Sequence, residues 1–206
     1  MNDSIAAPKS DELLRLAQDG DGTALGALLA IYRQYLLLLA RTQVGRRLQG
    51  KVDASDLVQE ACLEAHRHIG QFRGSSEAEF AAWLRSILAG LVANLVRRYL
   101  GTKQRDARLE QALAVELNNT SCMLDRGLAA AISSPSEQAV KREASVQLAN
   151  ALEQLPDDYR QTIILRHLEG LPFAQVAERM GRSVDSVEKL WVRALARLRR
   201  DMGDTP

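Results

Sequence analysis

The apolar residues of this chain recur at steps of three and four rather than in alternation. Between Val184 and Arg200 they form one stripe, made of Val184, Val187, Leu190, Trp191, Ala194, Leu195 and Leu198. Such spacing puts side chains on one face of an α-helix, whereas a half-buried strand needs alternation. Helix-forming residues dominate elsewhere too, and strand signals are nearly absent. The sequence therefore predicts an all-α fold.

Clusters of glycine, serine and proline divide this helical pattern into two parts. A length of 206 residues fits one large domain or two small ones. We expect helices over about 11–17, 23–48, 53–69 and 77–100, and again from Ser134 and near 156–168, 172–180 and 184–200. The predicted organisation is two small helical domains, residues 8–106 and 135–203, joined by a partly helical linker, residues 107–134.

Cysteine usage and hydropathy exclude several classes of protein. Cys62 and Cys122 belong to no CxxC or Cys/His cluster, so we expect neither a disulfide framework nor a metal site. The first residues lack the basic and apolar regions of a secretory signal. The apolar run from Tyr35 to Ala40 is too short to cross a bilayer and predicts a buried helix segment. We expect a reduced, cytoplasmic protein with no membrane association.

The segment "FAQVAERMGRSVDSVEKL" has the pattern of a helix-turn-helix. Ala177 is small where two helices must cross, and Gly181 stands where the turn needs a left-handed backbone. Val187 would pack the second helix on the first, and Ser183 would cap it. The alternative is a helical hairpin with no role in DNA binding.

The face of the second helix opposite its apolar stripe is mostly basic. It carries Asp185, Lys189, Arg193, Arg197, Arg199 and Arg200, with Glu188 at its edge. The N-terminal half of such a helix can enter a major groove, and its basic half can contact phosphates. The alternative is an ordinary solvated helix face.

The segment "DASDLVQEACLEAHRHI" places four carboxylates on one helical stripe, those of Asp53, Asp56, Glu60 and Glu64. Like charges at this spacing repel slightly, which favours a docking face for a basic partner. The alternative is that Asp53 and Asp56 favour the helix dipole and that the other two are solvated.

The helix expected over 77–100 is basic where the previous one is acidic. Arg85, Arg97, Arg98, Lys103, Arg105 and Arg108 follow one another with only Asp106 against them. Aromatic residues accompany them, namely Phe72, Phe80, Trp83 and Tyr99. Aromatic rings beside cations suit single-stranded nucleic acid, since bases stack while phosphates are neutralised. For Phe80, Trp83 and Tyr99 the alternative is core packing.

Taken together, these segments resemble the RNA polymerase sigma-70 family, in particular its small two-domain, extracytoplasmic-function (ECF) type. "DASDLVQEACLEAHRHIGQFRG" is similar to the family's polymerase-binding helix, and "FAAWLRSILAGLVANLVRRYLGTKQRD" to its −10 melting helix. The segment from Leu152 to Arg199 is similar to its −35-reading domain. Departures occur at Gly90, Asn94, Glu188 and Leu190, so the promoter sequence of other members does not transfer to this chain.

The resemblance implies a non-enzymatic factor that binds core RNA polymerase, opens the −10 element and reads the −35 element of promoter DNA. The implied polymerase-binding residues, on the largest-subunit coiled coil, are Asp53, Asp56, Gln59, Glu60 and Glu64. The implied −10 residues are Phe72, Phe80, Trp83, Asn94, Arg97, Arg98, Tyr99 and Arg105. The implied −35 residues are Arg182, Ser183, Asp185, Ser186, Lys189, Arg193 and Arg197. An anti-sigma factor is a further expected partner.

The alternatives to a polymerase-binding factor are a stand-alone DNA-binding regulator and an enzyme. A stand-alone helix-turn-helix regulator would bind an operator without polymerase. An enzyme would need a catalytic constellation, and none is found: His66, His68 and His167 are scattered, and no HExxH, P-loop or nucleophile elbow occurs. We expect solvated histidines, no catalytic residue and no cofactor.

Overall fold

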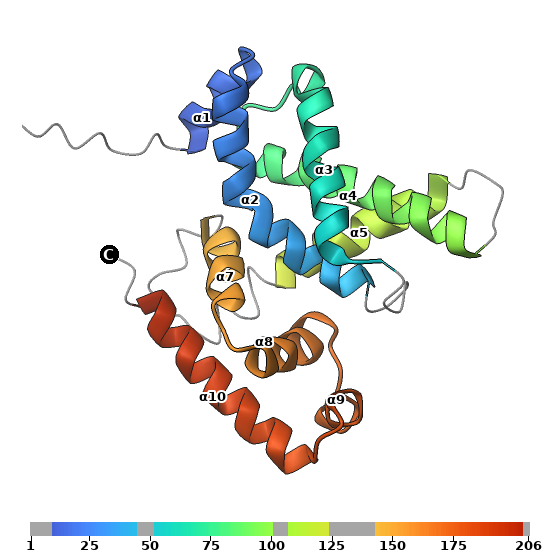
Figure 1. The fold of residues 1–206 in the computed structure, drawn as a ribbon, viewed down its shortest axis with the longest axis vertical. Coiled ribbons are helices and arrows are strands. Elements are labelled where there is room, and N and C mark those ends of the chain that lie inside the picture. The colour runs from blue at the N-terminus through green and yellow to red at the C-terminus, as the bar shows by residue number, and fades with distance from the viewer. Residues whose placement is uncertain (1–9, 45–51, 101–106, 124–142, 204–206) are drawn as a thin grey trace, which may run out of the picture.

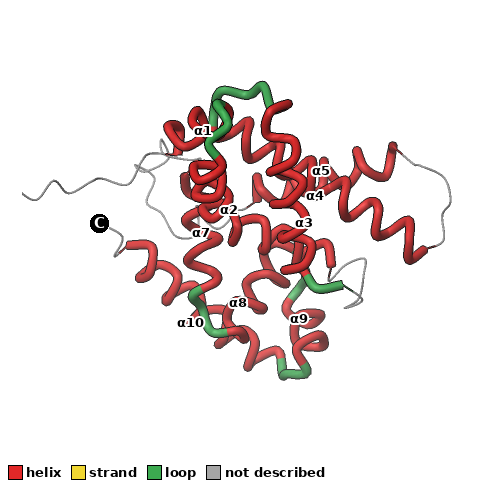
Figure 2. The backbone as a smooth tube through the Cα atoms, turned by 45° about the horizontal axis from the view of Figure 1, so that its top comes forward, coloured by secondary structure: helices red, strands yellow, loops and turns green. Residues whose placement is uncertain are grey.

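The computed structural model describes residues 10–44, 52–100, 107–123 and 143–203. Its helices are α1 (Ser10–Gln18), α2 (Gly22–Gln43), α3 (Ala54–His68), α4 (Glu77–Leu100), α5 (Ala107–Met123), α7 (Glu143–Glu153), α8 (Asp157–Ile163), α9 (Phe173–Met180) and α10 (Val184–Gly203). A π-helical turn, Ile164–Leu168, continues α8. These residues contain no strand (Figure 2), so the predicted all-α fold is confirmed. The helix start expected at Ser134 lies outside the described residues.

Local capping explains where the first long helices begin. The side chain of Asp21 accepts hydrogen bonds from the backbone N–H groups of Thr23 (2.8 Å) and Ala24 (3.1 Å), and α2 starts directly after it. Ser76 and Glu79 form a reciprocal capping box at the start of α4: each backbone N–H donates to the other's side chain. These caps satisfy N–H groups that a helix leaves unpaired at its N-terminus.

Helix α2 is the centre of the N-terminal bundle and contacts α1, α3, α4 and α7 (Figure 1). Its side chains Leu28, Leu36 and Leu39 are completely buried. The apolar run from Tyr35 to Ala40 is buried throughout, as the sequence predicts. Because α2 is apolar on nearly all sides, the other helices can surround it and share a single hydrophobic core.

Helix α5 returns along α4 and belongs to the same packed unit (Figure 1). Leu113 and Leu117 of α5 are fully buried. At the end of this interface the guanidinium of Arg85 donates to Asn118 (2.6 Å) and to the hydroxyl of Tyr35 (2.7 Å). The first part of the predicted linker is therefore a helix that packs on α4.

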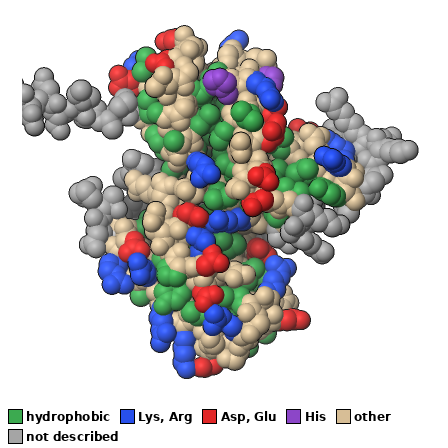
Figure 3. All heavy atoms as spheres, in the orientation of Figure 1, with side chains coloured by type: hydrophobic (Ala, Val, Ile, Leu, Met, Phe, Trp, Pro, Cys, Tyr) green, Lys and Arg blue, Asp and Glu red, His purple; other side chains and the backbone are tan. Residues whose placement is uncertain are grey.

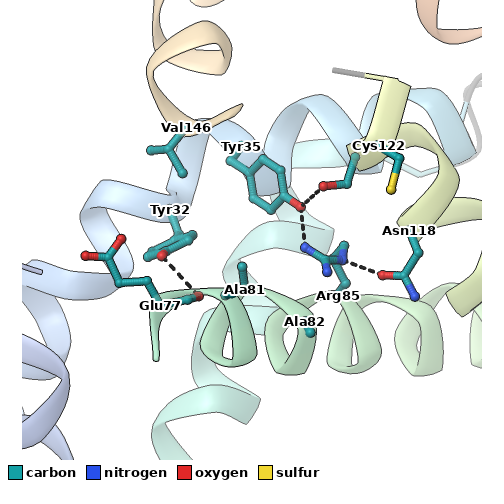
Figure 4. Close-up of a pocket in the computed structure, with 11 residues that line it drawn as sticks. Tyr32, Tyr35, Glu77, Ala81, Ala82, Arg85, Asn118, Cys122 and Val146 are labelled. Atoms are coloured by element: carbon teal, nitrogen blue, oxygen red, sulfur yellow. Dashed lines mark hydrogen bonds between the residues drawn. The ribbon is translucent and has the colours of Figure 1, made fainter. Parts of the chain in front are cut away.

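A cavity of about 320 Å³ lies beside this hydrogen-bond network, between α2, α4, α5 and the start of α7 (Figure 4). The Tyr35 hydroxyl donates to Ser121 (3.0 Å), and the Tyr32 hydroxyl donates to the carbonyl of Glu77 (3.4 Å). Burial raises the pKa of Tyr32 far above its ordinary value, and the nearby Glu77 adds to this shift. Tyr32 is thus a neutral hydrogen-bonding group, and the hydrogen bonds of the two tyrosines join α2 to α4 and α5.

The C-terminal helices pack directly on the N-terminal bundle through α2 and α7. Arg41 of α2 makes a two-pronged ion pair with Glu153 of α7, at 2.6 and 3.3 Å. Arg160 of α8 also contacts Glu153, at 3.3 Å. Leu148 and Leu152 of α7 are buried in the same hydrophobic cluster as the side chains of α2. We call this interface the α2–α7 seam. The domain boundaries inferred from the sequence, residues 8–106 and 135–203, stay a prediction.

Two helices, α2 and the Glu77–Tyr99 part of α4, are long and apolar enough to cross a membrane by length and composition alone. Core helices of soluble proteins pass the same test. In this structure α2 and α4 pack against each other and against α1, α3 and α5. Their apolar composition is therefore accounted for by the shared core.

Candidate functional site

Helix α3 presents a row of carboxylates on its outer side, the acidic row of Asp53, Asp56, Glu60 and Glu64. The opposite side of the helix buries Leu57, Val58, Ala61 and Ala65. Asp53 and Asp56 are exposed, as is the neighbouring Gln59, while Glu60 and Glu64 are partly exposed. Figure 3 shows acidic side chains gathered near the middle of one face of the molecule. The predicted stripe therefore faces outward, away from the hydrophobic core.

The first residue of the acidic row also caps its helix. Asp53 accepts a hydrogen bond from the backbone N–H of Ser55 at 2.8 Å. This bond lowers the pKa of Asp53, because it favours the ionised carboxylate. Asp53 is therefore charged throughout the neutral range, and its negative charge lies at the positive end of the helix dipole.

The other end of the acidic row is partly neutralised by the last turn of α3. Arg67 lies 2.6 Å from Glu64 and 3.6 Å from Glu60, and His68 lies 3.2 Å from Glu64. Exposed ion pairs of this kind contribute only about 0–1 kcal/mol to stability, so the basic side chains of a binding partner can replace Arg67 and His68. Asp53 and Asp56 are the exposed members of the row, and Gln59 is exposed beside them.

The aromatic residues expected to meet DNA form a cluster with each other. Phe80 is completely buried and Phe72 is 7% exposed, with their ring centroids 5.7 Å apart. Trp83 is partly exposed and packs at 5.1 Å from Phe72 and 5.7 Å from Phe80. The expectation of base stacking is wrong for Phe72 and Phe80 in this structure, because both rings are buried in the core, where Phe80 also packs on Tyr32 of α2 at 5.4 Å. Trp83 retains an accessible face.

The basic end of α4 is accessible to a ligand. Asn94, Arg98 and Tyr99 are exposed, and Tyr99 is 43% exposed. Arg97 is partly exposed and donates to the side-chain oxygen of Asn94. The structure thus brings four of the predicted −10 residues to the same helix end. Arg105 lies outside the described residues.

Helices α9 and α10 form the predicted helix-turn-helix. Gly181 follows α9 with φ 61° and ψ 35°, the left-handed conformation that the sequence pattern requires. Its backbone N–H bonds back to α9, which ends the helix. Val176, Ala177 and Val187 are buried in a small cluster of their own. The turn is therefore fixed by one glycine and by a compact apolar contact between the two helices.

The start of α10 is capped as expected and surrounded by charged pairs. The Ser183 hydroxyl accepts from the backbone N–H of Ser186 at 3.2 Å. Arg182 pairs with Asp158 of α8 at 2.5 Å, so this cation also holds the turn against α8. Lys189 pairs with Asp185 at 2.7 Å. Ser186 is only partly exposed, whereas the other residues named here are exposed.

Basic side chains continue along the outer edge of α10 (Figure 3). Arg193 is exposed, and Arg197 lies 3.5 Å from Asp201. Both lie on the same helix as Lys189, one and two turns further on. These cations form a surface that can follow a nucleic-acid backbone.

An aromatic cluster, which the sequence pattern did not predict, fixes α10 on the side that faces α9 and the π-helical turn. The indole N–H of Trp191 donates to Nε2 of His167 at 2.8 Å, and Trp191 also packs on Phe173. Arg166 lies 4.9 Å above the ring of Phe173. The expectation of a solvated His167 is wrong: burial, and secondly Arg166, lower its pKa and keep it neutral. A tryptophan on an apolar stripe needs an acceptor for its N–H, which is the signal that sequence reasoning overlooked. His66 and His68 are exposed, as expected.

Metal and thiol chemistry find little support. Within the described ranges, no three His, Cys, Asp or Glu side chains are grouped so as to hold a metal ion. Cys62 is partly buried and Cys122 is exposed, and both are free thiols. Burial raises the pKa of Cys62, so its thiol is less reactive than an ordinary one. The accessible chemistry of the described surface consists of charged and hydrogen-bonding groups suited to macromolecules.

Comparison with known proteins gives the family. The sigma-70 region 2 model matches residues 31–102, and the sigma-70 region 4 model matches residues 145–198. The ECF RNA polymerase sigma-E factor of Haemophilus influenzae is 30% identical over 183 residues, which cover 88% of this chain and 89% of that protein. The RNA polymerase sigma-H factor of Pseudomonas aeruginosa is 29% identical over 191 residues, 92% of each chain.

Among solved structures, that of CnrH in complex with the cytosolic domain of CnrY covers 95% of this chain and 99% of its own. It is 24% identical, with a TM-score of 0.36. The two matched ranges contain the acidic row on α3, the basic end of α4 and the helix-turn-helix of α9 and α10. The chain belongs to the sigma-70 family and is an ECF-type sigma factor, a non-enzymatic protein that directs transcription initiation.

Proposed function

We propose that three separate surfaces of this sigma factor divide the work of initiation. The acidic row on α3 binds the coiled coil of the largest subunit of core RNA polymerase. The basic end of α4 meets the −10 element, and α10 reads the −35 element. The proposal is carried by one observation: Asp56 and Gln59 are exposed on a helix whose opposite side is buried, so their side chains are accessible to a basic partner.

The charge pattern supports this division. Surfaces of opposite sign on α3 and on α4 and α10 can bind a basic protein and a polyanion at the same time. Two aromatic side chains of α4 keep an accessible face: Trp83 near the start of the helix, and Tyr99 beside Arg97 and Arg98 at its end. Unstacking a base costs a few kcal/mol, and stacking on an aromatic ring returns about 1–3 kcal/mol per base. A half-buried tryptophan therefore suits the stabilisation of an opened strand.

The same reasoning disfavours the stand-alone regulator, since such a protein has no need of an exposed acidic row. We further propose a cytoplasmic location, where core polymerase and promoter DNA are found. An anti-sigma factor as a partner is a proposal that follows from the family alone.

The test of the docking proposal is charge reversal in the acidic row. Asp56→Lys with Glu60→Lys should abolish co-purification with core polymerase and promoter-specific run-off transcription, while far-UV circular dichroism stays unchanged. A matched control is Glu12→Lys with Asp19→Lys, two exposed carboxylates on and just after α1 that give the same change in net charge. Retention of polymerase by the Asp56 and Glu60 variant, or equal loss by the control, would contradict docking through α3.

A further inference from the structure

The outward face of α10 carries two side chains that the three surfaces above do not use. Val187, Ala194 and Leu198 turn this helix's apolar stripe into the protein, with no exposed area. Glu188 and Val192 lie outside this buried stripe, and they are four residues apart and therefore neighbours on the helix surface. Val192 is 58% exposed, more than any other exposed large apolar side chain in the described part of the chain.

Two of the charged pairs around these residues are already matched. Asp185 and Lys189 neutralise each other at 2.7 Å, and Arg197 contacts Asp201. Across the residues that the structure describes, Glu188 has no cationic partner, and it is exposed. The face of α10 that is offered to DNA therefore contains one uncompensated carboxylate next to one exposed aliphatic side chain.

A carboxylate close to DNA has few favourable partners. Phosphates repel it, and it can only accept hydrogen bonds. In the major groove, cytosine offers the N4 amino donor alone, whereas the N6 donor of adenine stands beside the N7 acceptor, which repels a carboxylate. An exposed valine finds its own complement in the 5-methyl group of thymine. Each side chain therefore favours one base.

We propose that Glu188 and Val192 are base-reading residues that select a cytosine and a nearby thymine in the −35 element. This inference rests on the proposed placement of α10 in the major groove. Four residues of helix span about 6 Å, and base pairs are about 3.4 Å apart, so the two selected bases lie within about two base pairs of each other. Lys189 and Arg193, on the neighbouring face, contact the phosphates that hold this register.

The test uses holoenzyme made from the full chain and core polymerase, on promoters whose −35 region is randomised, with transcripts counted by sequencing. With the wild-type protein, the transcribed promoters should be enriched in a cytosine at one position of the −35 region and in a thymine within two base pairs of it. Glu188→Arg should change the cytosine preference to guanine, and Glu188→Gln should change it to adenine, because these side chains pair with those bases. Each wild-type preference should be about 5- to 140-fold, the range of a good base contact. Glu178→Gln, an exposed carboxylate on α9, should leave the selected sequences unchanged.

The methyl contact has a test of its own. Replacing the selected thymine by uracil, which lacks only the 5-methyl group, should weaken wild-type binding about fourfold. Val192→Ser should weaken binding to thymine and remove the difference between the two bases. Val115→Ala, an exposed valine on α5, should keep the full difference and serves as the control.

The outcomes separate this inference from the proposed function. If wild-type holoenzyme shows no base preference anywhere in the −35 region, the placement of α10 itself is wrong. If it does show one, but Glu188→Arg selects the same bases as wild type, Glu188 reads no base. Equal sensitivity to uracil in wild type and Val192→Ser would likewise remove Val192 from recognition.

Discussion

Replacing Gly181 by alanine tests whether the turn before α10 depends on backbone conformation alone. Gly181 has φ 61° and ψ 35°, yet a Cβ built on it meets no atom within 4 Å. Clash with other parts of the protein therefore plays no part, and the cost of the substitution comes from the close approach of Cβ to the following carbonyl oxygen in the left-handed conformation. For a residue with a side chain that cost is about 1–2 kcal/mol.

Part of this cost is offset in the unfolded chain. Alanine is less flexible than glycine, which stabilises a folded protein by about 0.4–1 kcal/mol wherever the backbone allows it. Gly181→Ala should thus lower the free energy of unfolding by about 1 kcal/mol in total, or the melting temperature by about 2–4 °C for a chain of this size. Gly181→Asn should lose less, since asparagine tolerates this conformation.

Gly26 provides the matched control, because it lies inside α2, is exposed, and also has open space around its Cβ position. Gly26→Ala should raise the free energy of unfolding by about 0.5–1 kcal/mol, since glycine weakens a helix interior. Urea titrations of both variants measure the two changes. If Gly181→Ala raised the free energy of unfolding as much as Gly26→Ala does, the left-handed turn would not exist in solution.

Three further predictions concern the surfaces and the cluster behind α10. Trp83→Ala should reduce open-complex formation more than polymerase binding, and Trp83→Phe should retain most of it; an equal loss on a pre-melted promoter would mean that Trp83 only packs. Arg193→Ala should weaken promoter binding broadly and reduce the salt dependence by about one counterion, so an unchanged slope would place Arg193 away from phosphate. His167 has its pKa below the ordinary value of 6.5 because of burial and Arg166, and only its neutral form accepts the Trp191 N–H. The contribution of His167 to stability is therefore complete above pH 6.5 and is lost as the pH falls through the lower pKa of the folded state. His167→Gln should make the free energy of unfolding depend less on pH below 6.5. The same pH dependence in the variant and in wild type would contradict this.

The sequence was sufficient for features that are set by short-range spacing. The helix-turn-helix followed from Ala177, Gly181 and Val187, because a tight turn between two helices permits few residue types at those offsets. The acidic row on α3 followed from helical periodicity alone. Both features depend on residues within a few turns of one another, so tertiary context changed neither.

Features set by contacts between distant segments were not predictable in the same way. Phe72 and Phe80 are aromatic residues that could form a stacking surface, but they are buried against each other and, for Phe80, against Tyr32 of α2, which lies 48 positions earlier in the chain. The role of His167 depends on Trp191, 24 residues away, which no local pattern connects to it. The packing of α5 on α4 likewise rests on Leu113 and Leu117, whose spacing suits a linker helix and a core helix equally well.

The α2–α7 seam has a consequence for how the two halves of the molecule can move. Arg41 and Glu153 are joined there, and Leu148 and Leu152 lie in an apolar layer shared by both halves. A small sliding movement would misalign the ion pair and open a void without releasing either half, so intermediate arrangements are penalised. We therefore expect the two bundles to separate as whole units rather than to slide along each other.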